Sequence, residues 1–164
     1  MNGKRIYTEK ELFNKYSTLC AGAEYCCFDI RKKMQRQEVS EELADSVLQH
    51  LQKEQFIDEK RYAHAFVRDK FRYNRWGRVR LQQELRMKGV PQLFIDEALE
   101  EISEDESYKT LLSLLQKKLP SVKGKNGYEV KMKLMRFAMS RGFNADMARK
   151  IVEDELSIGD GVDD

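Results

Sequence analysis

The sequence predicts an all-α protein made of tandem three-helix repeats, about nine helices in an elongated, curved array. Three observations lead to this prediction. The 164 residues include only two prolines and nine glycines. Apolar residues recur at helical spacing along most of the chain. Residues that favour helix starts and ends divide the chain into short helical segments at similar intervals.

The first three helices are expected within residues 1–57. Thr8 and Glu11 have the spacing of a capping box, which predicts a helix from there to about residue 25. A second helix is expected over residues 27–37. Ser40 is expected to cap the third helix of this group.

The next three helices are expected within residues 58–102. Asp58 can cap a helix over residues 58–75, which the Trp76-Gly77 step interrupts. The helix over residues 77–88 is followed by Gly89, the residue type that favours a helix C′ position. The third helix is expected over residues 91–102, where Pro91 suits the first turn.

The last three helices are expected within residues 103–156. Ser103 and Glu106 form a second capping-box pattern, which opens the seventh helix. After a loop, the eighth helix is expected to end at Gly142, and Asn144 is expected to cap the ninth. The domains expected are therefore repeat 1 (1–57), repeat 2 (58–102), repeat 3 (103–156) and a disordered acidic, glycine-rich tail (157–164).

A common register supports the repeats. Glu38, Gly89 and Gly142 lie 51 and 53 residues apart, and aligning them brings apolar positions into five columns. A repeat of this size cannot bury its apolar face fully alone, so neighbouring repeats are expected to pack together. The alternative interpretation is that any two amphipathic helices joined by a tight turn look alike. The five columns are Ile30, Leu81 and Leu134; Met34, Leu85 and Ala138; Val39, Val90 and Phe143; Leu43, Phe94 and Met147; Val47, Ala98 and Ile151.

Positive charge is concentrated between Lys60 and Lys88. This segment holds ten lysines and arginines and two acidic residues, whereas the whole chain has a net charge of only +2. Such a segment suits a polyanion or an acidic protein surface. The alternative is a solvated helix face with ordinary surface arginines. The candidate partner-binding or DNA-binding residues are Arg61, Arg68, Arg72, Arg75, Arg78, Arg80 and Lys88.

Helical geometry separates two faces of the helix expected over residues 58–75. The arginines at positions 61, 68, 72 and 75 fall on one side. Tyr62, Phe66 and Tyr73 fall together on another. An arginine stripe can donate bidentate hydrogen bonds to phosphate or carboxylate groups.

Several function classes are excluded. No apolar run is long enough to span a bilayer, and residues 1–13 lack the apolar core of a signal peptide, so a cytoplasmic protein without membrane contact is expected. The three cysteines and two histidines show no metal-binding or nucleophile-base pattern. We therefore expect no enzyme activity, no cofactor and no metal.

Two stretches, FIDEKRYAHAFVRDKF and RWGRVRLQQELRMKGV, together with SRGF in the third repeat, resemble the RecX family of recombination regulators. The resemblance extends from about Glu9 to Leu156. It implies tandem three-helix repeats, no catalysis, and binding to the RecA recombinase on single-stranded DNA. Such binding restrains the filament, its ATP hydrolysis and strand exchange, which implies a role in recombination, DNA repair and the SOS response.

The chain departs from the family pattern at two positions. Glu38 stands where the second and third repeats have glycine. Trp76 places a large aromatic ring beside Gly77, where a smaller or polar residue is expected. Trp76 is either a packing anchor between repeats or an exposed contact for a partner.

Two functional hypotheses follow. The first is a monomeric, non-enzymatic regulator that binds the recombinase filament, with DNA contacted directly or through the filament. The second is a general nucleic-acid-binding helical protein without recombinase specificity. If about six basic residues met phosphates, log affinity would fall with log salt at a slope near −5 for duplex DNA.

Overall fold

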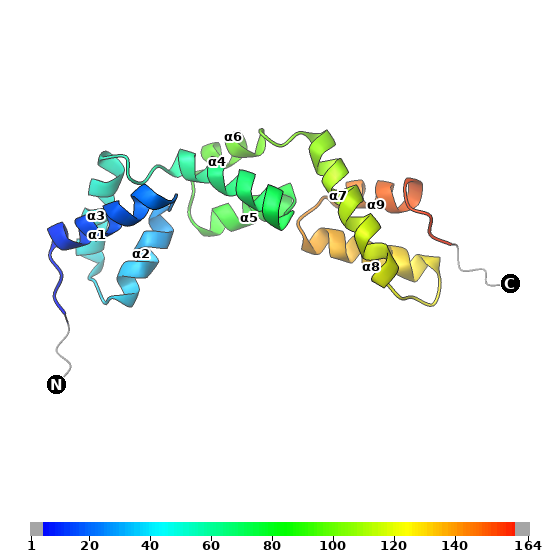
Figure 1. Ribbon diagram of the computed structural model, residues 1–164, viewed down its shortest axis with the longest axis horizontal. Coiled ribbons are helices and arrows are strands. Elements are labelled where there is room, and N and C mark those ends of the chain that lie inside the picture. The colour runs from blue at the N-terminus through cyan, green and yellow to red at the C-terminus, as the bar shows by residue number, and fades with distance from the viewer. Residues whose placement is uncertain (1–4, 160–164) are drawn as a thin grey trace. The chain divides into compact units, whose positions relative to one another are not determined.

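The computed structural model describes residues 5–159 (Figure 1). Within this range there are nine α-helices, one π-helical turn and one 3-10 turn, and no β-strand. The predicted all-α class and number of helices are confirmed for the described residues. None of the helices in this range is both long and apolar enough to cross a membrane.

The described helices pack into two compact units. Unit 1 contains residues 5–66 and 85–96, and unit 2 contains residues 67–84 and 97–159. The division passes through the second predicted repeat, so packing does not follow the repeat boundaries drawn from the sequence. Those boundaries, and the curvature of the array, stay predictions.

Unit 1 begins with α1 (Glu9–Gly22), α2 (Cys27–Arg36) and α3 (Glu41–Lys53). Both α1 and α2 pack on α3 (Figure 1). Thr8 and Ser40 cap α1 and α3 through their hydroxyl oxygens, as predicted. The first helix ends three residues before the expected position, because Gly22 has low helix propensity and Ala23 is extended. The core of these helices consists of Leu12, Tyr16, Cys20, Ile30, Met34, Ala44, Val47, Leu48, Leu51 and Ile57.

The basic helix consists of α4 (Glu59–Asp69) followed by the π-helical turn η1 (Lys70–Asn74). Asp58 caps it, because its Oδ1 atom accepts a hydrogen bond from the backbone of Arg61 at 2.9 Å. The expectation that Tyr73 shares the apolar face of Tyr62 and Phe66 is wrong. A π turn takes more residues than an α turn, so the side chains within and after it are rotated out of register with those of α4. Tyr62 is buried, whereas 74% of Tyr73 is exposed.

The remaining helices are α5 (Arg78–Met87), α6 (Gln92–Leu99), α7 (Glu104–Lys118), α8 (Gly127–Ser140) and α9 (Ala145–Asp154). In unit 2, α7, α8 and α9 pack on one another (Figure 1). A short 3-10 turn, η2 (Leu119–Ser121), follows α7. Ser103 and Glu106 form the predicted capping box of α7, and Asn144 caps α9. The core here consists of Leu111, Leu115, Leu134, Ala138, Phe143, Ala148, Ile151 and Val152.

The acidic tail predicted at 157–164 lies largely outside the described residues, which end at Gly159. Of its described part, Ile158 is half-buried and packs against the core of α7, α8 and α9. The chain therefore stays attached to unit 2 for at least four residues after the end of α9 at Asp154.

A left-handed residue joins the second and third helices of each repeat. Glu38, Gly89 and Gly142 have φ angles of 61°, 71° and 90°. At each turn, the next residue donates a backbone hydrogen bond to the carbonyl five positions earlier, and the left-handed residue donates to the carbonyl three positions earlier. This is the bonding pattern of a Schellman helix end. The register predicted from the sequence is thus confirmed, and Glu38 adopts the conformation that glycine takes in the other two repeats.

The aligned columns agree with this register. Every member of the columns that begin with Ile30, Met34 and Val47 is fully buried. Every member of the column that begins with Leu43 is half-buried. Because three helix pairs show the same burial at the same distance from the same turn, they are structural repeats and not merely amphipathic helices of similar length.

Replacing Leu85 by alanine tests the register by its effect on stability. Leu85 is fully buried, so Leu85→Ala should lower the free energy of unfolding by about 2–5 kcal/mol. The matched control is Met87→Ala in the same helix, because 73% of Met87 is exposed. Urea unfolding followed by circular dichroism measures both variants. A cost below about 0.5 kcal/mol for Leu85→Ala would contradict the buried position.

Candidate functional site

The seven basic residues predicted from the sequence occupy three different settings. Arg61 and Lys88 make ion pairs within unit 1. Arg78 and Arg80 donate hydrogen bonds to backbone carbonyls within unit 2. The remaining three line a groove in unit 2, and they are Arg68, Arg72 and Arg75.

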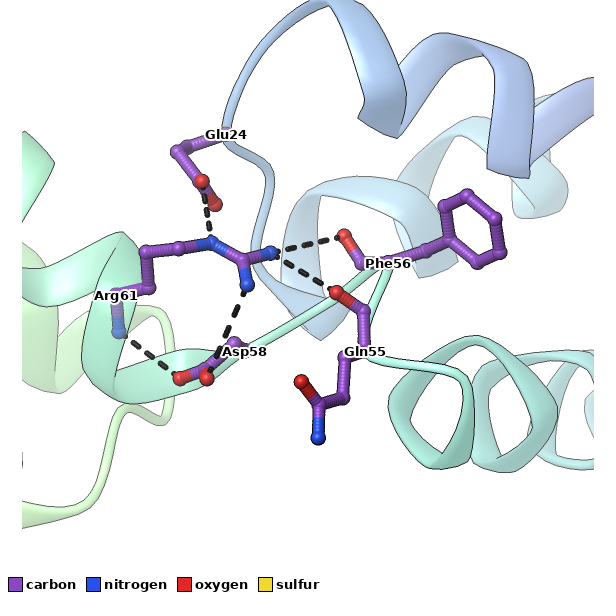
Figure 2. A network of polar contacts seen from close by, with 5 residues as sticks. All are labelled: Glu24, Gln55, Phe56, Asp58 and Arg61. Atoms are coloured by element: carbon purple, nitrogen blue, oxygen red, sulfur yellow. Dashed lines mark hydrogen bonds and ion pairs between the residues drawn. The ribbon is translucent and has the colours of Figure 1, made fainter.

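Arg61 stabilises the start of α4 (Figure 2). Its Nε atom donates to Glu24 Oε1 at 2.5 Å, and another guanidinium nitrogen donates to the carbonyl of Gln55 at 3.1 Å. Asp58 lies 3.9 Å from the same guanidinium. Although Arg61 is exposed, its hydrogen-bonding capacity is largely used by the chain that precedes its own helix.

Lys88 lies in a second polar network of unit 1. Its ammonium group donates to Asp29 Oδ1 at 3.0 Å and to the Tyr62 hydroxyl at 2.8 Å. It also lies 5.5 Å from the centre of the Tyr62 ring. Since Asp29 belongs to α2, this lysine connects the second helix of the chain with the basic helix.

The same network changes the acidity of its members. Burial raises the pKa of Tyr62. Burial also acts to raise the pKa of Asp29, but the hydrogen bonds from Lys88 and Cys26 outweigh it and the pKa is lowered. At neutral pH the network therefore holds the Asp29 carboxylate and the neutral phenol of Tyr62.

The start of α5 lies against the turn between α8 and α9. Gly77 donates to the carbonyl of Arg141 at 2.7 Å, and Val79 donates to that of Gly142 at 3.0 Å. A Cβ atom on Gly77 would overlap the backbone of Gly142, and one on Gly142 would overlap Arg80. Both glycines are therefore required for this close backbone approach.

Two predicted site residues support this junction. Arg80 stacks on the ring of Trp76 at 4.0 Å and donates to the carbonyl of Ser140 at 3.5 Å. Arg78 donates to the carbonyl of Ile102 at 3.1 Å. Trp76 is half-buried here. Its contacts favour the interpretation of a packing anchor over that of an exposed partner contact.

The third setting is a groove of about 540 Å³ within unit 2. The end of α4 and η1 form one wall, and the segment from the end of α6 into α7 forms the other. The first wall carries the three arginines with Val67 and Phe71. The second wall consists of Glu101, Ile102, Glu106, Lys109 and Thr110.

Arg68, Arg72 and Arg75 differ from the other predicted residues in having free guanidinium groups. The guanidinium groups of these three residues form no hydrogen bond or ion pair with another residue in the described range 5–159. Arg68 and Arg72 are exposed and Arg75 is half-buried. Three unpaired guanidinium groups at one groove make it the strongest anion-binding feature among the predicted residues.

The opposite wall of the groove could not be found by sequence reasoning about the basic helix alone. Thr110 belongs to the third predicted repeat, and neither Thr110 nor Ile102 carries a binding signal. Val67 is a buried apolar residue without a binding signal, yet it lines the same groove. The signal that could have indicated this wall is the connection of only four residues between α6 and α7, which places Glu101 and Glu106 on the same side of the groove.

The described residues offer little for catalysis. Burial raises the pKa of the Cys26 and Cys27 thiols to about 12, so both are protonated at neutral pH and are poor nucleophiles. His50 stacks on Phe13 with ring centres 3.8 Å apart. Within residues 5–159, no cluster of His, Cys, Asp and Glu has an arrangement that could hold a metal ion.

The fold and this surface define a class, the tandem three-helix-repeat proteins with a basic groove on a helical scaffold. Two family descriptions match the chain, "RecX, second three-helix domain" over residues 58–99 and "RecX, third three-helix domain" over residues 104–152. The chain belongs to the RecX family. The resemblance seen in the sequence is thereby confirmed.

Curated relatives cover most of the chain. "Regulatory protein RecX" of Haemophilus influenzae is 33% identical over 135 residues, which are 82% of this chain and 88% of the relative. The protein of the same name from Chlorobium phaeobacteroides is 31% identical over 145 residues, covering 88% and 93%. These relatives are named as regulatory proteins, not as enzymes.

Solved structures show the same fold. A crystal structure of regulatory protein RecX matches 94% of this chain and 83% of its own with a TM-score of 0.77 and 21% identity. The crystal structure of RecX from Lactobacillus salivarius matches 89% and 95% with a TM-score of 0.72 and 16% identity. At these identities the similarity establishes the fold alone.

The lowered pKa of Asp29 predicts a pH-dependent contribution to stability. A carboxyl with a depressed folded-state pKa stabilises the fold above its unfolded pKa, near 3.8, and loses this effect as the pH falls through the folded value. Asp29→Asn should therefore destabilise the protein by about 1–3 kcal/mol at pH 7, because it leaves Lys88 without its carboxylate. The difference from the parent protein should shrink below pH 3.8.

Urea unfolding at pH 7 and at pH 3 measures this effect. The control is Asp45→Asn, which removes a more exposed ion pair with Arg31 and should cost less than about 1 kcal/mol. An equal cost of Asp29→Asn at both pH values would show that the carboxylate charge does not contribute, and would contradict the prediction.

Proposed function

We propose that this chain is a non-enzymatic regulator that binds a RecA-type recombinase filament on single-stranded DNA and restrains its ATP hydrolysis and strand exchange. The observation that carries the proposal is the set of three unpaired arginines at the unit 2 groove, Arg68, Arg72 and Arg75. Membership of the RecX family, whose curated members are named regulatory proteins, supports it.

The seven predicted basic residues have different roles in this proposal. The three groove arginines make the direct contacts, because their donors are unused within the described chain. The other four residues stabilise the fold around the basic segment through hydrogen bonds to backbone carbonyls or, for Lys88, to Asp29. They are Arg61, Arg78, Arg80 and Lys88. Their exposed edges add positive potential, which speeds the encounter with a negatively charged partner.

The repeats suit a target that is itself repetitive. Several weak contacts on one scaffold give a higher total affinity than any single contact, provided that all of them can engage at once. A filament of identical protomers offers such a series of sites. We propose that the chain acts as a monomer in the cytoplasm. Its activity would contribute to recombination, DNA repair and the SOS response.

Titration of the chain into a single-strand-dependent ATPase assay of the recombinase tests this function. The titration is carried out once without added DNA beyond that in the filament, and once with a large excess of free single-stranded DNA. Inhibition at less than one molecule per recombinase protomer that persists with added DNA would support filament binding. Inhibition that disappears with added DNA would identify a general nucleic-acid binder and contradict the proposal.

Charge reversal in the groove tests the residues. The double variant Arg68→Glu, Arg72→Glu should weaken binding to the filament by about tenfold or more, equivalent to about 1.4 kcal/mol. Both side chains are exposed, so the helical circular dichroism should not change. Fluorescence anisotropy of the labelled chain with assembled filament measures the affinity.

The matched control for this variant is Arg36→Glu, Arg136→Glu. These arginines are also exposed and belong to α2 and α8, outside the groove. The control has the same change in net charge, so it separates a local contact from general electrostatic attraction. Equal losses of affinity in both double variants would remove the groove from the binding mechanism.

A further inference from the structure

The unit 2 groove combines two kinds of surface. Its rim carries guanidinium groups, and its floor is apolar. Phe71 is the apolar lining residue that an occupant can reach, because it is half-buried, whereas Val67 and Ile102 are only 0% and 4% exposed and support the floor from within. A volume of about 540 Å³ lies in the range of sites that hold a few side chains or a small ligand.

The opposite wall is not uniformly basic. Glu101 and Glu106 lie there with Lys109. The Glu106 carboxylate accepts a hydrogen bond from the backbone of Ser103 at 3.2 Å, so its position is fixed by the cap of α7. Lys109 is paired with Asp105 at 3.0 Å. This wall therefore offers an anion little net attraction, in contrast to the arginine wall.

These features distinguish two possible occupants. A nucleic-acid strand carries a negative charge at every phosphate, and those nearest Glu101 and Glu106 would be repelled. Its phosphodiester groups would also gain nothing from the apolar floor. A peptide can instead place carboxylates on one side of the groove and an apolar side chain on the floor, which matches both surfaces.

We propose that this groove binds an acidic peptide segment of a partner protein, with an apolar side chain on Phe71 and carboxylates on Arg68, Arg72 and Arg75. The inference rests on the proposed function in taking the recombinase as the source of that segment. The guanidinium groups provide paired donors for carboxylates. The buried apolar contact provides selectivity among acidic segments, because charge alone would accept any of them.

The first test uses fluorescein-labelled peptides of about ten residues and the full chain. One peptide contains aspartate, glutamate and two central leucines. The second has the same acids with serines in place of the leucines, and the probe for nucleic acid is a labelled oligothymidylate. The proposal expects the leucine peptide to bind at least about fivefold more tightly than the serine peptide. Equal affinities for the two peptides would overturn the use of the apolar floor.

Two variants locate the binding. Arg68→Glu, Arg72→Glu should weaken binding of the leucine peptide by about tenfold. Thr110→Trp should weaken it by about fivefold or more, because the indole occupies the groove while every arginine remains. Circular dichroism confirms that both variants are folded. Peptide binding that is unchanged by both would overturn the proposal.

Binding of the oligothymidylate shows whether the groove is instead a nucleic-acid site. If Thr110→Trp leaves its binding unchanged while peptide binding falls, the groove is a peptide site. If Thr110→Trp weakens oligothymidylate binding as much as charge reversal does and the leucine peptide does not bind, the groove is a nucleic-acid site and the proposal is overturned.

The recombinase ATPase assay tests the proposed regulatory function independently of peptide binding in the groove. Inhibition by the parent chain without peptide binding would overturn the groove inference and leave the regulatory function intact. Peptide binding that requires the arginines and the apolar floor, without inhibition, would support the groove inference and contradict the regulatory function.

Discussion

The structure depends most on the left-handed turn between the second and third helices of each repeat. One residue with positive φ closes the earlier helix and directs the chain into the next, with the same backbone hydrogen bonds in each repeat. This fixes which residues of both helices are buried. In the third repeat the turn has a further role, because Gly142 lies directly against the start of α5. A side chain at that position would separate the two backbones.

The basic segment has to satisfy both folding and binding. A guanidinium group that pairs within the fold loses much of its capacity to bind another molecule. Arg61, Arg78 and Arg80 are of this kind, and Lys88 pairs with Asp29 in the same way. Of the seven predicted basic residues, Arg68, Arg72 and Arg75 are the ones whose side chains have no partner within residues 5–159. A high local charge in a sequence thus overstates the size of the surface that can contact a partner.

Helix periodicity and capping residues were sufficient to predict most of the fold. Thr8, Ser40 and Asn144 cap the helices predicted for them, and the repeat register places Leu81 and Leu85 in the interior. Periodicity failed at Tyr73, because nothing local in the sequence announces the π turn that rotates it into solvent. The concentration of charge was enough to nominate the seven basic residues, but their division into paired and unpaired groups depends on partners distant in sequence. Arg80 and Ser140 are 60 residues apart. The groove wall at Thr110 was missed for the same reason.

The most direct test is to place a photo-crosslinking amino acid at position 109 and irradiate the chain with recombinase assembled on single-stranded DNA. Lys109 lines the groove, but its side chain is exposed, so a bulky residue there leaves the groove open. Position 136 on α8, which is exposed and outside the groove, serves as the control. We expect crosslinks from position 109 to the recombinase polypeptide, at an acidic segment, and few from position 136. Crosslinks from position 109 to DNA alone, or crosslinks to the recombinase from position 136 alone, would show that the groove does not bind the recombinase.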